Sequence, residues 1–327
     1  MMTNETNNNQ VEFPGEKKPK IVFFGTPEFA VASLDRLVKD GHDIAAVVTM
    51  PDKIAGRGHK LIQSDVKKYA VEAGLRVLQP EKLKNEEFLG ELRKINADLF
   101  IVIAFRMLPE VVWGMPRLGT FNLHGSILPN YRGAAPINRA IMNGEKETGI
   151  TTFFLTHTID TGDIIDIKKT PINDEDNAGT IHDRLMEMGA EMVAETVEKI
   201  SEGHLTLSPQ PEGEFTPAPK IFREDCAIDW NNDAQKIHNQ IRGLSPYPAA
   251  YTTLIEGNGR RYEAKIFESR MLEKSAAGIP GDISTDGHRL IVECGNGALE
   301  ILSLQPAGKK RMAADAFLRG YAPEKAI

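Results

Sequence analysis

Asn122, His124 and Asp160 are the residues of this 327-residue chain whose types and spacing best suit chemistry. Asn122 and His124 stand two residues apart near the end of a predicted strand at residues 119–124, so their side chains point to the same side. Asp160 follows an apolar run at residues 150–155. A carboxamide and an imidazole can hold a developing oxyanion, and a nearby carboxylate orients the imidazole and favours its charged form. We therefore predict a catalytic trio, with a purely structural histidine as the alternative.

The same stretches give little support to metal, nicotinamide or serine-nucleophile chemistry. Asp160 and Asp163 are acids in one loop, but no further His or Cys lies at ligand spacing from them. Gly25 follows the first strand, where a dinucleotide fold carries GxGxxG, yet the later glycines are missing and Pro27 has no N–H for a phosphate. Ser126 lies in His-Gly-Ser-Ile-Leu rather than in a GxSxG elbow. The sequence therefore predicts a protein that uses neither a metal nor a nicotinamide cofactor.

The composition is that of an ordinary globular protein, with 41% hydrophobic residues, 26% charged residues and a net charge of −7. No apolar run is long enough to span a bilayer, and the polar start is unlike a signal sequence. Cys226 and Cys294 are the only cysteines, too few for a disulfide framework or a CxxC metal site. We expect a cytoplasmic protein with no membrane partner, and the negative charge argues against broad, non-specific binding of nucleic acid.

Buried strands alternate with amphipathic helices through the first half of the chain. The predicted strands are residues 20–24, 43–49, 76–78 and 98–104, and the predicted helices begin at Pro27, Ser64 and Glu86. This alternation indicates an α/β fold with an open, mostly parallel sheet and helices on both faces. Ligands of such sheets bind beyond the carboxyl ends of the strands, which is where His124 falls.

The chain divides into four predicted parts. Residues 1–19 are polar and form a disordered tail. Residues 20–203 form the catalytic domain, and residues 204–219, with four prolines, form a semi-rigid linker. Residues 220–327 carry short alternating strands and two Gly-Asn-Gly turns, which are typical of a small β-barrel; the oligonucleotide-binding (OB) type is one candidate.

Two basic segments are candidates for contacts with phosphates. Residues 51–61 form a glycine-bearing loop, and its basic residues are Lys53, Arg57, His59 and Lys60. Lys309, Lys310 and Arg311 follow a Pro-Ala-Gly turn. On composition alone, a solvated surface is the favoured interpretation of both segments. Residues 220–327 hold 15 Lys and Arg against 14 Asp and Glu, so a basic patch there is only weakly indicated.

Longer blocks of the sequence resemble one family. Residues 122–129 (NLHGSILP), 131–136 (YRGAAP) and 160–163 (DTGD) are similar to motifs shared by the folate-dependent formyltransferases. Within that family, the chain resembles the methionyl-tRNA formyltransferases over nearly everything but its tails. The more specific features are residues 24–27 (FGTP) with 51–52 (PD) and 55–58 (AGRG), residues 228–230 (IDW) with 241–242 (IR) and 246–248 (PYP), and residues 304–310 (LQPAGKK).

The resemblance implies a Rossmann-like formyltransferase domain followed by a C-terminal OB-type β-barrel. It also implies transfer of the formyl group of 10-formyltetrahydrofolate to initiator methionyl-tRNA without a metal, and we expect the protein to be a monomer. The family's functional residues fall on three sets of positions. The catalytic set is Asn122, His124 and Asp160, the folate-binding set is Ser126, Ile127, Leu128 and Pro129, and the tRNA-binding set is Arg57, Lys60, Lys220, Lys309 and Lys310.

One segment departs from the family pattern. Arg106 stands in residues 104–109, where the family has a small, apolar, Gly-containing segment that helps to form the wall of the folate pocket. Two other functions stay open: formyl transfer to a sugar amine or nucleotide sugar, and non-catalytic binding of tRNA through the barrel. The first should lack the Arg57 loop and the barrel, and an intact trio speaks against the second.

Overall fold

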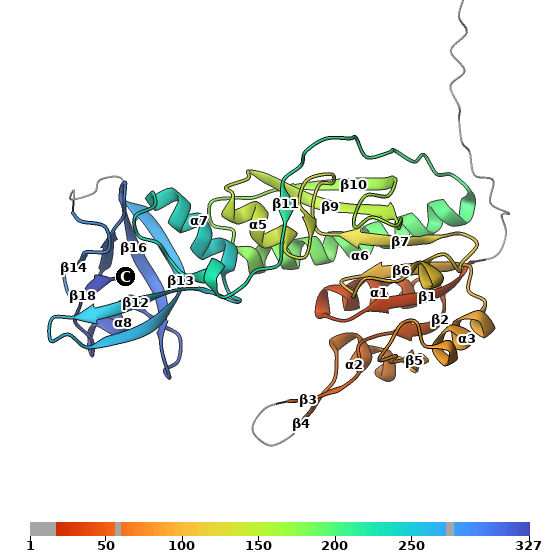
Figure 1. Ribbon diagram of the computed structural model, residues 1–327, viewed down its shortest axis with the longest axis horizontal. Coiled ribbons are helices and arrows are strands. Elements are labelled where there is room, and N and C mark those ends of the chain that lie inside the picture. Colours follow the sequence, from red (N-terminus) through yellow and green to blue (C-terminus); the bar gives the residue numbers. More distant parts are fainter. Residues whose placement is uncertain (1–17, 56–59, 273–277) are drawn as a thin grey trace, which may run out of the picture. The chain divides into compact units, whose positions relative to one another are not determined.

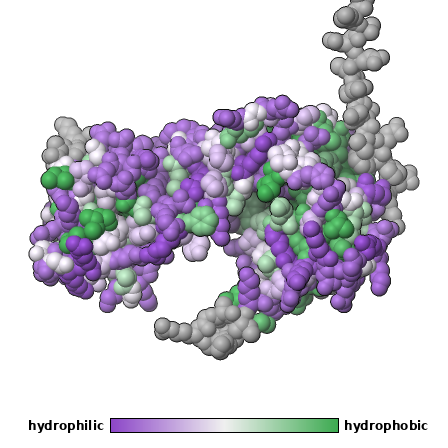
Figure 2. All heavy atoms as spheres, in the orientation of Figure 1, coloured by the Kyte–Doolittle hydropathy of each residue, from purple (hydrophilic) through white to green (hydrophobic). Residues whose placement is uncertain are grey.

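The computed structural model describes residues 18–55, 60–272 and 278–327 (Figure 1). The chain forms two compact units. The first comprises residues 1–132, 149–169 and 183–216, and the second comprises residues 133–148, 170–182 and 217–327. Within the described residues, no helix has the length and apolar character needed to cross a bilayer. On the face of each unit that Figure 2 shows, hydrophilic residues predominate and hydrophobic residues lie in separate patches.

A seven-stranded sheet forms the centre of the first unit, with the strand order β10-β9-β7-β6-β1-β2-β5. Its strands are β1 Lys20–Gly25, β2 Asp43–Val48, β5 Val77–Leu78, β6 Leu99–Ile103, β7 Thr120–His124, β9 Glu147–Phe154 and β10 Ile164–Pro171. The strands from β7 to β5 are parallel, and β9 runs antiparallel to β7. The predicted α/β fold with a mostly parallel sheet is confirmed.

Two helices of the first part of the chain, α2 and α3, begin at side chains that cap them. The helices of this part of the chain are α1 Glu28–Lys39, α2 Asp65–Glu72, α3 Glu86–Ile95, α4 Glu110–Trp113 and α6 Ala178–Glu202. Ser64 Oγ accepts a hydrogen bond from Lys67 N at 3.0 Å, and so satisfies one of the free N–H groups at the start of α2. Asn85 Oδ1 does the same for Glu87 N of α3 at 2.8 Å.

The register of the sheet determines which way the predicted catalytic side chains point. Asn122 lies beside Val102 of β6, and Val102 packs in the core that α3 covers. Asn122 and His124 therefore point to the α3 side of β7. Leu123 points to the other side, where a Cβ on Gly189 of α6 would lie 2.7 Å from Leu123 Cδ2. The glycine lets α6 pack closely against the back of the strand that carries the site.

The basic segment predicted as a loop contains two short paired strands, β3 Lys53–Ala55 and β4 Lys60–Ile62. A hydrogen-bonded cluster holds the base of this hairpin, because Asp52 accepts from Lys67 Nζ at 2.5 Å and from Gln79 Nε2 at 2.8 Å. Residues 56–59, which include Arg57, lie outside the described residues.

An antiparallel sheet that almost closes into a barrel forms the second unit. Its strand order is β14-β15-β16-β13-β12-β18, with β17 beside β16. The strands are β12 Ala250–Glu256, β13 Arg261–Leu272, β14 Ile283–Thr285, β15 Leu290–Glu293, β16 Ala298–Pro306, β17 Met312–Ala313 and β18 Pro323–Ala326. A bridge between Asp282 and Lys325 joins the two edges of the sheet. The predicted C-terminal β-barrel is confirmed.

The second unit has its own apolar core. Its helices are α5 Pro136–Met142, α7 Ala234–Leu244, α8 Ala314–Leu318 and the 3-10 helix η1 Glu224–Cys226; the short strands β8 Arg132–Gly133 and β11 Pro217–Ala218 complete the elements. Trp230 and Phe317 lie in this core, and Trp230 Nε1 donates to Thr252 Oγ1 at 2.9 Å. Cys226 and Cys294 are both buried and free, and burial raises the pKa of the Cys294 thiol to about 12.

Candidate active site

Strand β7 carries the first two residues of the predicted catalytic trio and ends at the second, His124. Phe121 and Leu123 are buried on the back of the strand, so the alternation of side chains fixes Asn122 and His124 on the front. His124 is 8% exposed. Asn122 is half-buried, and its carboxamide has no side-chain hydrogen bond within the part of the chain that the structure describes. That amide is therefore available to a ligand.

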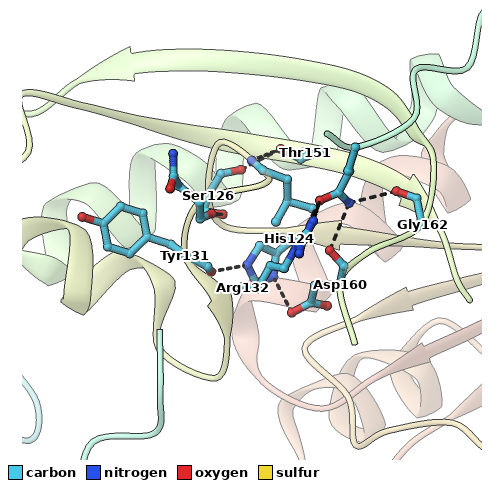
Figure 3. Close-up of polar contacts among 10 residues, drawn as sticks. His124, Ser126, Tyr131, Arg132, Thr151, Asp160 and Gly162 are labelled. Carbon is cyan, nitrogen blue, oxygen red and sulfur yellow. Dashed lines mark hydrogen bonds and ion pairs between the residues drawn. The ribbon is translucent and has the colours of Figure 1, made fainter. Parts of the chain in front are cut away.

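The two ring nitrogens of His124 face different partners (Figure 3). Nε2 lies 2.8 Å from the carbonyl oxygen of Tyr131. Because a carbonyl oxygen only accepts hydrogen bonds, Nε2 carries a hydrogen and donates it. Nδ1 lies 3.9 Å from Oδ2 of Asp160, a distance that is too long for a hydrogen bond but short enough for strong attraction when the ring is charged. Nδ1 is thus the nitrogen whose proton can change during a reaction.

The loop after β9 holds Asp160 in an unusual conformation. Asp160 has φ +54°, in the left-handed region that L-residues other than Asn and Asp seldom adopt. Gly162 lies so close to β9 that a Cβ would stand 1.7 Å from the carbonyl oxygen of Phe154. Phe154 N donates to Asp163 O at 3.0 Å and closes the loop. This backbone presents the Asp160 carboxylate, which is 12% exposed, to His124.

The stretch predicted to bind folate follows His124 directly. Ser126 is fully buried, and its hydroxyl donates to Asn130 O at 2.7 Å. Leu128 is also buried, in a small cluster with Phe153, and Thr151 Oγ1 links Ser126 O to Leu128 N. The Ser126 hydroxyl and the Leu128 side chain therefore hold the loop itself. Ile127 and Pro129 are half-buried, and a folate-binding role for the stretch stays a prediction.

One residue that contacts this site could not be predicted from the sequence. Gln210, in the predicted linker, donates from Nε2 to Asp160 O at 3.0 Å and to Gly162 O at 2.9 Å. Its Oε1 accepts from Arg132 Nε at 3.1 Å. Gln210 stands alone in a proline-rich stretch that has no regular apolar pattern, so the sequence does not indicate which residues it contacts.

Arg106, the departure from the family pattern, is bound to backbone. Its Nη1 donates to Glu81 O at 2.8 Å, and its Nη2 donates to Pro80 O. Burial lowers the pKa of the Arg106 guanidinium, and its Nε has no hydrogen-bond partner among the described residues. The side chain therefore ties the segment after β6 to the segment after β5.

The structure describes four of the five residues predicted to bind tRNA, one of them by its backbone alone. Arg57 lies outside the described residues, and Lys60 is described as the first residue of β4. Lys220 is exposed, with Nζ 5.6 Å from the centre of the Phe222 ring. Lys309 and Lys310 are exposed in the turn after β16, and Lys309 O accepts from Gln305 Nε2 at 2.7 Å.

The candidate site can thus do acid–base and oxyanion chemistry with protein groups. It combines an unpaired carboxamide on Asn122, a histidine with one committed nitrogen, and a carboxylate placed to stabilise its charge. Within the described residues, no three His, Cys, Asp or Glu side chains are grouped so that they could hold a metal ion.

Two family models match the chain. The model described as "Formyl transferase" matches residues 19–197, and the model described as "Formyl transferase, C-terminal domain" matches residues 220–322. The methionyl-tRNA formyltransferase of Bacteroides fragilis is 55% identical over 307 residues, which cover 92% of this chain and 95% of the relative. That of Flavobacterium johnsoniae is 48% identical over 305 residues, 93% of this chain and 96% of the relative.

Solved structures of other proteins share the fold. A sugar 3N-formyltransferase, WlaRD, determined with dTDP and 5-N-formyl-THF, has a TM-score of 0.64 at 20% identity, covering 90% of this chain and 100% of that one. HypX from Aquifex aeolicus, determined with tetrahydrofolic acid, has a TM-score of 0.63 at 20% identity, covering 93% of this chain and 47% of that one.

Proposed function

The chain belongs to the family of methionyl-tRNA formyltransferases, and we propose that it transfers the formyl group of 10-formyltetrahydrofolate to the methionyl amino group of initiator tRNA. The observation that carries this proposal is the pairing of Asp160 with His124 beside Asn122, in a chain 55% identical to a methionyl-tRNA formyltransferase over 92% of its length. The sugar amine and binding-module alternatives have no comparable support.

We assign the chemistry to the three side chains at the end of β7 and in the Asp160 loop. The uncharged methionyl amine attacks the formyl carbon on N10 of the folate, and a tetrahedral oxyanion forms. The Asn122 carboxamide donates an N–H to that oxygen. The protonated Nδ1 of His124 donates a second hydrogen bond, because Nε2 is already committed to Tyr131 O.

Proton transfers complete the exchange. The attacking nitrogen loses one proton, N10 gains one, the C–N10 bond breaks and tetrahydrofolate leaves. Asp160, 3.9 Å from Nδ1, stabilises the charged ring and, through water, relays the proton of the amine. These steps use only the two substrates and the side chains of one chain, which fits a monomeric cytoplasmic enzyme.

The proposal extends to folate and tRNA contacts. Ser126, Ile127, Leu128 and Pro129 form the folate-binding stretch, in which Ser126 and Leu128 act by holding the loop. We place tRNA contacts on Arg57, on Lys60, and on the exposed Lys220, Lys309 and Lys310. We retain residues 20–203 as the catalytic domain, 204–219 as the linker and 220–327 as the tRNA-binding domain.

The test is transfer of labelled formyl from 10-formyltetrahydrofolate to charged initiator tRNA. We expect rapid transfer to initiator methionyl-tRNA and little to elongator methionyl-tRNA. Asn122→Ala should lower kcat by about 100-fold, the usual effect of removing one oxyanion donor, while the variant stays folded. Wild-type transfer by this variant, or preferential transfer to a sugar amine, would reject the proposal.

The tRNA contacts have a separate test. A Lys309→Ala, Lys310→Ala double variant should raise the KM for tRNA and make that KM less dependent on salt. With fewer phosphate contacts, tRNA binding releases fewer counterions. The KM for the folate should not change. Arg57→Ala should behave in the same way. Unchanged tRNA kinetics across salt concentrations would contradict the assignment of these residues.

A further inference from the structure

We propose that Gln210 is a positioning residue of the catalytic site, which holds the Asp160 loop so that its carboxylate faces His124. The inference rests on the proposed function, because it assumes that Asp160 takes part in formyl transfer. Gln210 lies between α6 and β11, in the segment predicted to be a linker. Its carboxamide is neither a nucleophile nor an acid or base near neutral pH. Gln210 therefore acts through the residues that it contacts.

The Gln210 carboxamide has hydrogen-bond partners on both of its ends. Nε2 donates to the carbonyl oxygens of Asp160 at 3.0 Å and of Gly162 at 2.9 Å. Oε1 accepts from Arg132, from Nε at 3.1 Å and from Nη2 at 2.5 Å. An amide NH2 has only two donors, so both are committed to the loop. Figure 3 shows the dashed contacts that reach the backbone of Asp160 and Gly162.

Contacts such as those of Gln210 hold the backbone of the loop in a sparsely populated conformation. Asp160 has φ +54°, in the left-handed region, which Asp adopts only as a single residue. The two carbonyls that Gln210 binds belong to the peptide planes that follow Asp160 and Gly162. Fixing these planes fixes the backbone direction at Asp160 and hence the direction of its side chain.

The segment that carries Gln210 is itself anchored to the first unit. Ser208 and Ile164 exchange two backbone hydrogen bonds, Ile164 N to Ser208 O at 2.8 Å and Ser208 N to Ile164 O at 2.9 Å. Further along, Tyr131 N donates to Thr216 O at 2.6 Å. Tyr131 supplies the carbonyl that binds Nε2 of His124. Residues 208–216 therefore support the partners of both ring nitrogens of His124, which are Tyr131 O at Nε2 and the Asp160 carboxylate at Nδ1.

Gln210→Glu is the sharpest perturbation. It keeps the size of the side chain, but it replaces two donors with carboxylate oxygens that repel the carbonyls of Asp160 and Gly162, and it draws the new charge toward Arg132. We expect kcat to fall by about 100-fold, the scale of a displacement of about 1 Å at a catalytic group. The KM values for folate and tRNA should change little. Gln210→Met, which removes the hydrogen bonds without adding charge, should give a smaller loss of the same kind.

Gln240 provides a matched control. Its Nε2 also donates to two backbone carbonyls, Asp225 O at 3.0 Å and Ala227 O at 2.9 Å, within the second unit. Both glutamines are half-buried. Gln240→Glu should therefore lower the melting temperature about as much as Gln210→Glu, with kcat unchanged. This comparison separates loss of positioning from general loss of stability.

A double-mutant cycle with Asp160→Asn tests whether Gln210 acts through Asp160. We expect Gln210→Glu or Gln210→Met to lose much less of kcat in the Asp160→Asn background than in the wild type. The same fold-loss in both backgrounds, or wild-type kcat in both single Gln210 variants, would overturn the positioning role. Wild-type activity of Asp160→Asn alone would instead reject the proposed function of Asp160, whatever Gln210 does.

Discussion

The Nε2 atom of His124 lies 2.8 Å from the carbonyl oxygen of Tyr131. This contact assigns the hydrogen of the neutral ring to Nε2 and leaves Nδ1 as the nitrogen that gains and loses a proton opposite Asp160. The backbone thus sets the tautomer, and the carboxylate lies 3.9 Å from the other ring nitrogen. In many catalytic histidines a carboxylate fixes the tautomer; here a backbone carbonyl does so, and the carboxylate faces Nδ1.

This division predicts the effect of neutralising Asp160. Asp160→Asn keeps the shape of the loop but removes the charge that stabilises protonated His124, so kcat should fall by about 100-fold or more. The KM for folate should change little, because the backbone of the loop stays in place. Single-turnover formyl transfer under saturating substrates measures the effect.

Asp163→Asn is the matched control for this prediction. Asp163 lies three residues further along the same loop, and its side chain is exposed. Its neutralisation should leave kcat within about twofold of the wild type, since a solvated surface charge has a small effect. An equal loss from both variants would mean that the charge of the loop, and not the Asp160–His124 pair, matters.

Gly162 should be more important for activity than for folding. A Cβ at this position would stand 1.7 Å from Phe154 O, so Gly162→Ala must push the loop away from β9 and carry Asp160 with it. We expect kcat to drop by about 100-fold, with a smaller effect on stability because residues 156–159 of the loop are exposed and can move. Steady-state kinetics and thermal unfolding of the purified variant measure the two effects.

Gly90 gives the contrast. It lies in α3 with open space around the position of a Cβ. Gly90→Ala should leave kcat unchanged and stabilise the protein by about 0.5–1 kcal/mol, because alanine favours helix over glycine. Normal kinetics in Gly162→Ala would show that the loop tolerates the shift and that its close approach to β9 has no catalytic purpose.

Asp52 at the base of the hairpin should show a defined pH dependence. The hydrogen bond from Lys67 lowers the pKa of Asp52, and the bond from Gln79 adds to the effect. Because the folded pKa lies below the unfolded value of about 3.9, the stabilisation is present above that pH and is lost as the pH falls through the folded pKa. Asp52→Asn should therefore lower the melting temperature at pH 7, and the difference from wild type should shrink below about pH 4.

Asp174→Asn controls for the loss of a charge alone. Asp174 pairs with Lys146 at 3.5 Å, but its side chain is 89% exposed, so its neutralisation should have almost no effect at either pH. A melting temperature of Asp52→Asn that follows the wild type at every pH would show that the cluster does not stabilise the hairpin base.

Much of the fold follows from local patterns that the sequence displays. The apolar strands and the cap at Ser64 lie where predicted, because each depends on a few neighbouring residues. The side of the sheet that Asn122 and His124 share also follows from the two-residue alternation of side chains along a strand. The pairing of His124 with Asp160 was expected from residue types, and the structure supplies the distance and the choice of nitrogen.

Long-range contacts of single polar side chains could not be predicted. Gln210 meets Asp160 across 50 residues and Arg132 across 78, and no periodicity announces either contact. The sequence also gives no signal for the bounds of the short barrel strands β14, β17 and β18, which have two to four residues each. Their pairing depends on neighbours in the barrel, and their own sequences carry no alternation.

Arg242 is a buried cation that should dominate the stability of the second unit. It is 7% exposed, and burial lowers the pKa of its guanidinium. Nε donates to Asn239 Oδ1 at 2.9 Å, and Nη1 donates to Asn173 O at 3.1 Å and Asp176 O at 3.2 Å. Arg242→Met keeps much of the apolar stem but removes all three of these hydrogen bonds. We expect it to lower the free energy of unfolding by about 3 kcal/mol or more.

Urea unfolding can report this loss through Trp230, which is 3% exposed in the core of the same unit. Trp113 is the only other tryptophan, so a Trp113→Phe background isolates the signal. Arg319→Met is the control: Arg319 pairs with Asp315 at 2.9 Å but is 76% exposed, and such surface pairs contribute about 0–1 kcal/mol. If Arg242→Met cost no more than Arg319→Met, the three hydrogen bonds would not stabilise the unit, and the buried guanidinium would not be what holds residues 173–176 to α7.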